Sequence, residues 1–203
     1  MNKPLLSIAI FGLASIGFAN ELVNNGNFEA TPSNLGWTEA SSGGFVIIGD
    51  WSTSIVDSFG DLGPPTNTAW LGGSDSEVDT ITQSVLTPAT AATAFLDFDY
   101  RFTDEDLPMF DFFDVSIGGT SVFNTDIGGT FTGTLSGVIH KHINVLSLMN
   151  GTSKNLVFKV TTDSSLSSSV FVDNVKLTTT PEPATFAVLG LGAIALIRRR
   201  KKS

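Results

Sequence analysis

Hydrophobic and polar residues alternate along much of the chain between residues 20 and 177. The clearest case is Leu96–Phe102, where apolar side chains fall at every second position and charged ones lie between them. A period of two is typical of a strand with one buried face. Similar stretches are separated by turns rich in Gly, Asn, Ser and Asp. The expected strands are Glu21–Glu29, Phe45–Trp51, Thr68–Leu71, Val78–Leu86, Leu96–Phe102, Phe113–Ile117, Ser121–Phe123, Val138–Val145, Leu156–Thr161 and Val170–Leu177.

This pattern predicts an all-β body, an antiparallel β-sandwich with a jelly roll as the preferred topology, over residues 20–177. No stretch of this region has a convincing amphipathic helix period. The chain contains 16 phenylalanines, and aromatic residues favour strands. A body of about 160 residues is long enough for one domain with a sizeable core.

The N-terminal end has a different pattern. Lys3 precedes a mostly apolar stretch, Leu5–Phe18, and Gly17 and Ala19 place small residues at −3 and −1 of a cut before Asn20. This arrangement predicts a Sec signal peptide over residues 1–19, handled by the Sec translocon and signal peptidase. We therefore expect the body to lie outside the cytoplasm.

The C-terminal end combines a proline motif, an apolar stretch and a block of cations. Residues 178–183 are expected to be a linker, because prolines cannot donate a backbone hydrogen bond. Residues 184–203 predict one short transmembrane helix with a basic cytoplasmic end. The 14 residues at 184–197, apolar without a break from Phe186 to Ile197, span about 21 Å of helix, less than a hydrocarbon core of ~30 Å. This suits a temporary anchor; a buried C-terminal helix is the alternative. The motif is Pro181, Glu182 and Pro183, and the cations are Arg198, Arg199, Arg200, Lys201 and Lys202.

These three parts, in this order, resemble the PEP-CTERM sorting signal of exported proteins in Gram-negative bacteria that make exopolysaccharide. The resemblance implies recognition by an exosortase, a membrane protease-transpeptidase that cuts near the PEP triplet. The protein would be anchored in the inner membrane before processing and would then reach the cell surface or extracellular matrix. The resemblance concerns sorting and leaves the activity open.

The charge of the body is strongly negative. The chain has 11 Lys and Arg and 20 Asp and Glu, a net charge of −9. Lys3, the five C-terminal cations and Glu182 lie in the terminal segments, so the body keeps 5 cations and 19 acids, a net charge of −14. Such a surface repels nucleic acid and anionic lipid and favours cations or neutral polymers. No nucleic-acid partner is expected.

The two ends of the body resemble the first and last strands of galactose-binding-like jelly rolls, which include several families of carbohydrate-binding modules. The matching stretches are VNNGNFEA at 23–30 with Gly36-Trp37, and SVFVDNVKL at 169–177. AWLGG at 69–73, ITQSV at 81–85 and FLDFDYRF at 95–102 resemble the same kind of domain. The resemblance implies that the first and last strands lie side by side.

The same resemblance implies a structural calcium ion held by the acid after the NGNF turn and the acid of the final D-N-V, here Glu29 and Asp173. Calcium accepts six to eight oxygens in irregular geometry. An ion that binds only the folded state would also compensate for the absence of cysteine, in a compartment where disulfides are common. In the alternative interpretation, both carboxylates are solvated or accept turn hydrogen bonds.

Other candidate residues have a structural explanation beside the functional one. Trp37 lies in a Gly/Ser/Asn-rich segment and could be an exposed platform for a sugar ring, whereas Trp51 and Trp70 are expected in the core. His140 and His142 would need a third ligand to bind zinc, so we expect an exposed polar face. The acidic run Asp104–Asp106, with Asp111 and Asp114, lacks EF-hand spacing and predicts a solvated loop.

The sequence contains no nucleophile elbow, HExxH or phosphate loop, so we do not expect an enzyme. The favoured function is an exported, exosortase-processed surface or matrix protein that is non-catalytic and binds exopolysaccharide. A purely structural surface or biofilm component without sugar specificity is the alternative. A polysaccharide hydrolase using two carboxylates is the less favoured third hypothesis.

Overall fold

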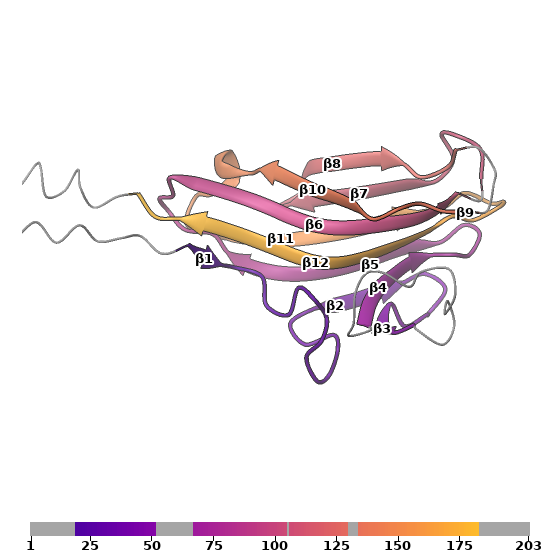
Figure 1. Cartoon of the computed structure of the whole chain (residues 1–203), viewed down its shortest axis with the longest axis horizontal. Coiled ribbons are helices and arrows are strands. Elements are labelled where there is room, and N and C mark those ends of the chain that lie inside the picture. Colours follow the sequence, from indigo (N-terminus) through magenta and orange to yellow (C-terminus); the bar gives the residue numbers. More distant parts are fainter. Residues whose placement is uncertain (1–18, 52–66, 105, 130–133, 183–203) are drawn as a thin grey trace, which may run out of the picture.

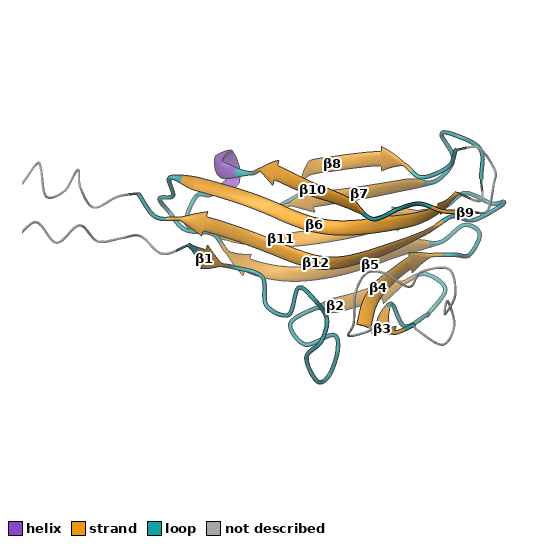
Figure 2. Ribbon diagram, in the orientation of Figure 1, coloured by secondary structure: helices purple, strands orange, loops and turns teal. Residues whose placement is uncertain are grey.

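The protein folds as two antiparallel β-sheets packed face to face, described here from a computed structural model that covers residues 19–51, 67–104, 106–129 and 134–182 (Figure 1, Figure 2). The first sheet has seven strands; its main order is β10 (Ile139–Asn144), β6 (Thr93–Asp104), β12 (Ser169–Thr180), β4 (Asn67–Gly72) and β3 (Ile48–Asp50). The short strands β1 (Asn20–Glu21) and β9 (Thr134–Leu135) pair with β12 and β6. The second sheet has five strands, in the order β2 (Thr38–Ser41), β5 (Val78–Leu86), β11 (Ser153–Thr161), β7 (Phe112–Ile117) and β8 (Thr120–Asp126). The prediction of an all-β antiparallel sandwich is confirmed.

The core lies between the two sheets and combines aliphatic side chains with a cluster of aromatic rings. Phe98 of β6, which is fully buried, packs edge-to-face on Phe158 and Phe113 of the opposite sheet, with ring centroids 5.3 and 6.2 Å apart. The period-two alternation of β6 and β7 turns these side chains inward and their polar neighbours outward. Burial of each such ring stabilises the fold by about 1.5–3 kcal/mol.

The first and last strands of the body lie side by side, as the resemblance to galactose-binding-like domains implied. Asn20 of β1 pairs with Thr179 of β12, and the N–H of Leu22 donates to the carbonyl of Leu177 at 2.9 Å. The Glu21 carboxylate also accepts the Leu177 N–H at 2.8 Å. Strand β1 and the end of strand β12 therefore lie at the same end of the sandwich (Figure 1).

The expected opening strand, Glu21–Glu29, is wrong beyond its first residue. Asn25 and Phe28 have left-handed backbone angles, φ 52° and 58°, which end extended structure. The Asn25 side chain instead fixes a loop, because its Nδ2 donates to the Ser33 carbonyl at 2.7 Å and its Oδ1 accepts the Ala30 N–H at 2.9 Å. Two short strands, β2 and β9, were not predicted; β2 is polar in sequence and lies at a sheet edge.

The outer boundaries of the body differ slightly from the expected ones. Strand β12 continues to Thr180, so it includes the first three residues of the expected linker, 178–183. Residues 1–18 of the expected signal peptide, 1–19, and all of the expected transmembrane segment, 184–203, lie outside the described residues. Within the described ranges, no helix has the length and hydrophobicity that a membrane span requires.

Candidate functional site

Trp37 lies in the core, which corrects the prediction of an exposed platform. Its side chain is 6% exposed and packs against Phe28 and Phe158, with ring centroids 5.5 and 6.1 Å apart. The indole N–H donates to the Asn25 carbonyl at 3.0 Å, which satisfies its polar edge. The loop that holds Trp37 is polar, but the ring itself belongs to the hydrophobic core.

Trp51 and Trp70 were expected in the core but are both partly exposed. In β4 the side chains of Ala69 and Leu71 are fully buried, so the alternation turns Trp70 to the outer face of its sheet. The Trp51 ring meets Trp70 edge-to-face at 5.4 Å, and the Trp70 ring lies 5.5 Å from Phe171. An aromatic surface of this kind is what sugar rings stack on.

Glu29 and Asp173, the predicted calcium ligands, lie close enough to interact electrostatically. Asp173 is 4% exposed, and burial raises its pKa from 3.8 to about 7, with the charges of Glu29 and Asp99 adding to the rise. The Asn174 N–H donates to Asp173 Oδ1 at 2.7 Å and opposes the rise. Burial makes the ionisation of such a carboxyl group unfavourable, and a bound cation would make its ionisation favourable.

Hydrogen bonds from Asn67 hold the Glu29 carboxylate. The backbone N–H of Asn67 donates to Oε1 and its side-chain amide donates to Oε2, both at 3.0 Å. These bonds link the loop after β1 to the start of β4. They are also compatible with the alternative in which Glu29 accepts hydrogen bonds and binds no metal, because the carboxylate has donors even without a cation.

The bulge of β12 next to Asp173 is built around a close backbone approach. The register shifts between Asp173 and Lys176, and Asn174 has a left-handed φ of 54°. The Val175 N–H donates to the Gly26 carbonyl at 2.8 Å, and a side chain at Gly26 would put its Cβ 1.8 Å from the Val175 carbonyl oxygen. Only glycine fits there, which explains the Gly in the NGNF turn.

The two histidines lie on the outer face of β10, opposite two aspartates of β6. His140 Nδ1 lies 2.8 Å from Asp99 Oδ1, and His142 Nδ1 lies 2.5 Å from Asp97 Oδ1. The histidine side chains are 62% and 56% exposed, so the expectation of an exposed polar face is confirmed. Each ring has a carboxylate partner.

The acidic run after β6 divides into exposed and buried members. Asp114 is partly exposed and accepts a hydrogen bond from the Ser121 hydroxyl at 2.5 Å. Asp106 and Asp111, in contrast, are 3% and 0% exposed. The prediction of a solvated loop is therefore wrong for these two residues, whose backbone positions turn their carboxylates into the protein rather than toward water.

A second buried acidic pair lies at the start of β5. Glu77 and Asp79 are each 2% exposed, and each has a buried carboxylate oxygen without a hydrogen-bond partner. Burial raises the pKa of Asp79 to about 6, and the neighbouring charge of Glu77 adds to it. The Gly72 N–H donates to Asp79 Oδ2 at 2.9 Å and lowers the pKa in part. No sequence motif marks this pair, because Asp79 lies within the regular alternation of Val78–Leu86 and Glu77 directly precedes it.

An open polar hollow of about 470 Å³ lies beside the β7–β8 turn and the start of β11. Amide and hydroxyl groups line it, which suits hydrogen bonding to a polyol, but no aromatic ring does. The lining residues are Gly118, Gly119, Asn150, Thr152, Ser153, Lys154 and Asn155.

The sorting residues that the structure describes are exposed. Pro181 and Glu182 follow directly after β12 and extend from the sandwich. Pro183 and the cations at 198–202 lie outside the described residues.

Comparison with known proteins gives one sequence match and several structural ones. Residues 179–201 match the PEP-CTERM protein-sorting motif. The chain carries a PEP-CTERM sorting signal. The signal implies an exported protein that is anchored in the membrane before processing, and it also implies an exosortase. A search among curated proteins finds no match to this chain.

The structural matches all have low sequence identity to this chain. One is the carbohydrate-binding module TmCBM61, solved in complex with β-1,4-galactotriose: TM-score 0.50, 15% identity, covering 78% of this chain and 97% of that one. Another is the K2 cleaved adhesin domain of Lys-gingipain: TM-score 0.49, 14% identity, covering 81% and 98%. A Stig cyclase from Fischerella sp. TAU matches with TM-score 0.45 and 14% identity over 81% and 99%. At such identities the likeness to TmCBM61 establishes the jelly-roll sandwich alone.

Proposed function

We propose that this protein is an exported, non-catalytic component of the cell surface or extracellular matrix, processed by an exosortase, whose sandwich binds exopolysaccharide. The observation that carries the proposal is the position of the sorting signal. The motif match starts at residue 179, at the end of the last strand, and Pro181 and Glu182 are exposed.

This position makes processing compatible with a folded domain. Thr180 is the last residue of β12; its carbonyl accepts the Ala92 N–H at 2.7 Å and its hydroxyl lies 2.7 Å from that of Thr93. Pro181 has no N–H to continue the ladder. A protease acting near the PEP triplet can therefore release the sandwich without breaking a strand pair, and the product keeps its fold.

The proposal of sugar binding rests on the outer aromatic surface and the charge. The partly exposed rings of Trp51 and Trp70 offer apolar faces to pyranose C–H groups. A body charge of −14, from 5 cations and 19 acids, favours a neutral glycan over an anionic polymer. The fold shared with TmCBM61, which was solved with a galactotriose, supports the same class of ligand. Trp70 replaces Trp37 as the residue proposed to contact sugar.

We further propose that Glu29 and Asp173 hold a structural calcium ion. The burial of Asp173 and its raised pKa describe a carboxyl group whose ionised form is disfavoured until a cation offsets its charge. The ion would join the loop after β1 to the β12 bulge and so stabilise the folded state by mass action. Its expected role is structural rather than catalytic.

The proposal is tested by pull-down of the surface-released protein on exopolysaccharide from a producing strain. Trp70→Ala is expected to weaken saturable binding at least tenfold, while Asn155→Ala, in the polar hollow, leaves it unchanged. Loss in Asn155→Ala alone would move the sugar site to that hollow. Absence of saturable binding would favour the structural alternative, and release of oligosaccharides would favour the hydrolase.

A further inference from the structure

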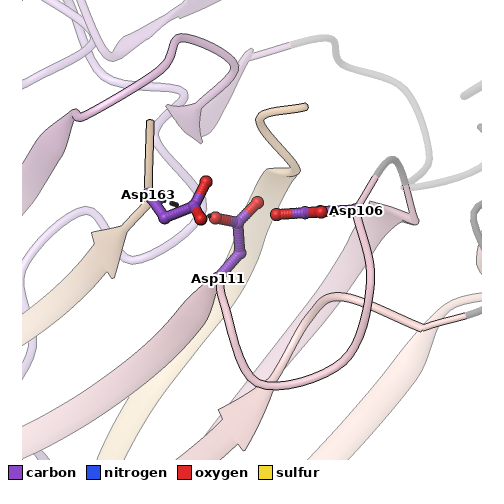
Figure 3. A group of neighbouring side chains, drawn as sticks. All are labelled: Asp106, Asp111 and Asp163. Carbon is purple, nitrogen blue, oxygen red and sulfur yellow. Dashed lines mark hydrogen bonds between the residues drawn. The ribbon is translucent and has the colours of Figure 1, made fainter. Parts of the chain in front are cut away.

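Three aspartates from two loops converge at the end of the sandwich opposite the chain termini. Strand β6 runs from Thr93, which pairs with Thr180, to Asp104, which pairs with β9; β1 and β9 mark opposite ends in Figure 1. Asp106 follows β6 and Asp111 precedes β7, whereas Asp163 follows β11. One carboxylate oxygen from each lies within 4.8 Å of the other two (Figure 3).

The carboxylate of Asp106 is buried and half unsatisfied. The side chain is 3% exposed; Oδ1 accepts the Leu107 N–H at 2.6 Å, while Oδ2 is buried and has no hydrogen-bond partner. Figure 3 shows this carboxylate facing that of Asp111. A buried carboxylate oxygen without a donor is costly. Here the carboxylate also has an oxygen within 4.8 Å of two further carboxylates, so a cation is a partner that would satisfy the arrangement.

Asp111 joins the two loops and is held in place by backbone donors. It is fully buried; the Asp163 N–H donates to its Oδ1 at 3.0 Å and the Ser168 N–H to its Oδ2 at 2.7 Å. Burial raises the pKa of Asp111, and the charge of Asp106 adds to the rise. Among the residues that the structure describes, no ion pair involves Asp106, Asp111 or Asp163.

We propose that Asp106, Asp111 and Asp163 form a calcium-binding site at the end of the sandwich opposite the chain termini. Calcium fits because all three ligands are hard oxygens from irregular loops, and two oxygens on opposite sides of the ion lie about 4.6–5.2 Å apart. Asp163 is partly exposed, so water can complete the coordination. The site is separate from Glu29 and Asp173 and does not depend on sugar binding.

Calcium at this site would fix a loop with exposed apolar side chains. Leu107, Met109 and Phe110 are 53%, 76% and 48% exposed, and they lie between two of the three aspartates. Met109 has a left-handed φ of 75°, which a free loop rarely maintains. Binding of the ion should therefore protect this segment from proteolysis.

The test is a calorimetric titration with CaCl₂. The full chain is purified in mild detergent and freed of metal with EDTA beforehand. Asp173→Asn is the background, because it removes the other candidate site. One calcium-binding event is expected in Asp173→Asn and also after adding Asp114→Asn, a matched loss of charge elsewhere. The calcium affinity is expected to fall at least tenfold when Asp106→Asn or Asp163→Asn is added to the Asp173→Asn background.

Calcium should also slow chymotrypsin cleavage after Phe110 in the Asp173→Asn background, but not when Asp106→Asn is added. Circular dichroism verifies that each variant is folded, and Asp163→Asn replaces Asp106→Asn if the latter is not. The proposal is overturned if Asp173→Asn binds no calcium. It is equally overturned if Asp106→Asn and Asp163→Asn leave affinity and cleavage unchanged.

Discussion

Asn20, at the start of the first strand, pairs with Thr179, two residues before the PEP triplet. The expected signal-peptide cut and the sorting motif therefore lie next to each other at one end of the sandwich. A domain tethered at this end would direct its opposite end, with the Asp106, Asp111 and Asp163 cluster, away from the membrane (Figure 1). The proposed sites and the sorting signal would then not compete for space.

This arrangement makes processing testable apart from folding. In a strain with an exosortase, Pro181→Ala and Glu182→Ala are expected to accumulate as the unprocessed membrane form, because both residues belong to the matched motif and are exposed. Their thermal unfolding midpoint should match that of the unaltered chain. Normal release of both variants into the medium would contradict the sorting proposal.

Replacement of Trp37 should act on stability. Trp37→Ala is expected to lower the free energy of unfolding by about 3–5 kcal/mol, because it opens a cavity between Phe28 and Phe158 and leaves the Asn25 carbonyl without its donor. Trp70→Ala should lower it less, since that ring is partly exposed. Urea denaturation of the full chain in detergent measures both. Equal effects would argue against the core position of Trp37.

Gly26 should tolerate no side chain. Gly26→Ala places a Cβ 1.8 Å from the Val175 carbonyl oxygen, so the β12 bulge must shift, and we expect a loss on the order of 2–3 kcal/mol. Gly137→Ala is the matched control, because no other group lies within 4 Å of the position that its Cβ would take. A loss of similar size in both would mean that the effect belongs to glycine replacement in general.

Asp79 should make the protein less stable as the pH rises. Its folded pKa of about 6 lies above the ordinary 3.8. The stabilisation is therefore complete below about pH 4 and is lost as the pH rises through 6. In EDTA, Asp79→Asn should raise the unfolding midpoint at pH 8 by roughly 3–6 °C and change it little at about pH 3.5. Asp114→Asn is the control, and a pH-independent effect of Asp79→Asn would contradict this prediction.

Alternation in the sequence was sufficient to predict the sandwich and most of its strands, because inward residues such as Phe98 and Val115 repeat with period two. It could not predict the loop from Leu22 to Trp37, whose shape depends on the hydrogen bonds of the Asn25 side chain. The tryptophans were assigned to the wrong environments because the polarity of a segment does not show which way one ring in it points. A polar loop can carry a core ring, and an apolar strand such as β4 has one outward face.

The candidate sites show a similar limit. The pair Glu29 and Asp173 could be named because short motifs place it, but the burial of Asp106 and Asp111 depends on where two loops meet. No local pattern around Asp163, about 50 positions later in the chain, connects it to them. Only the pairing of β7 with β11 brings these residues together.

The most direct test of the account is the affinity of the surface-released protein for the producing strain's own exopolysaccharide, measured by co-sedimentation in Ca²⁺ and in EDTA. The account predicts saturable binding that Trp70→Ala weakens at least tenfold and that Trp37→Phe, if folded, retains. It also predicts weaker binding in EDTA as the protein loses stability. An unaltered protein that stays in the supernatant under both conditions would contradict the proposed function.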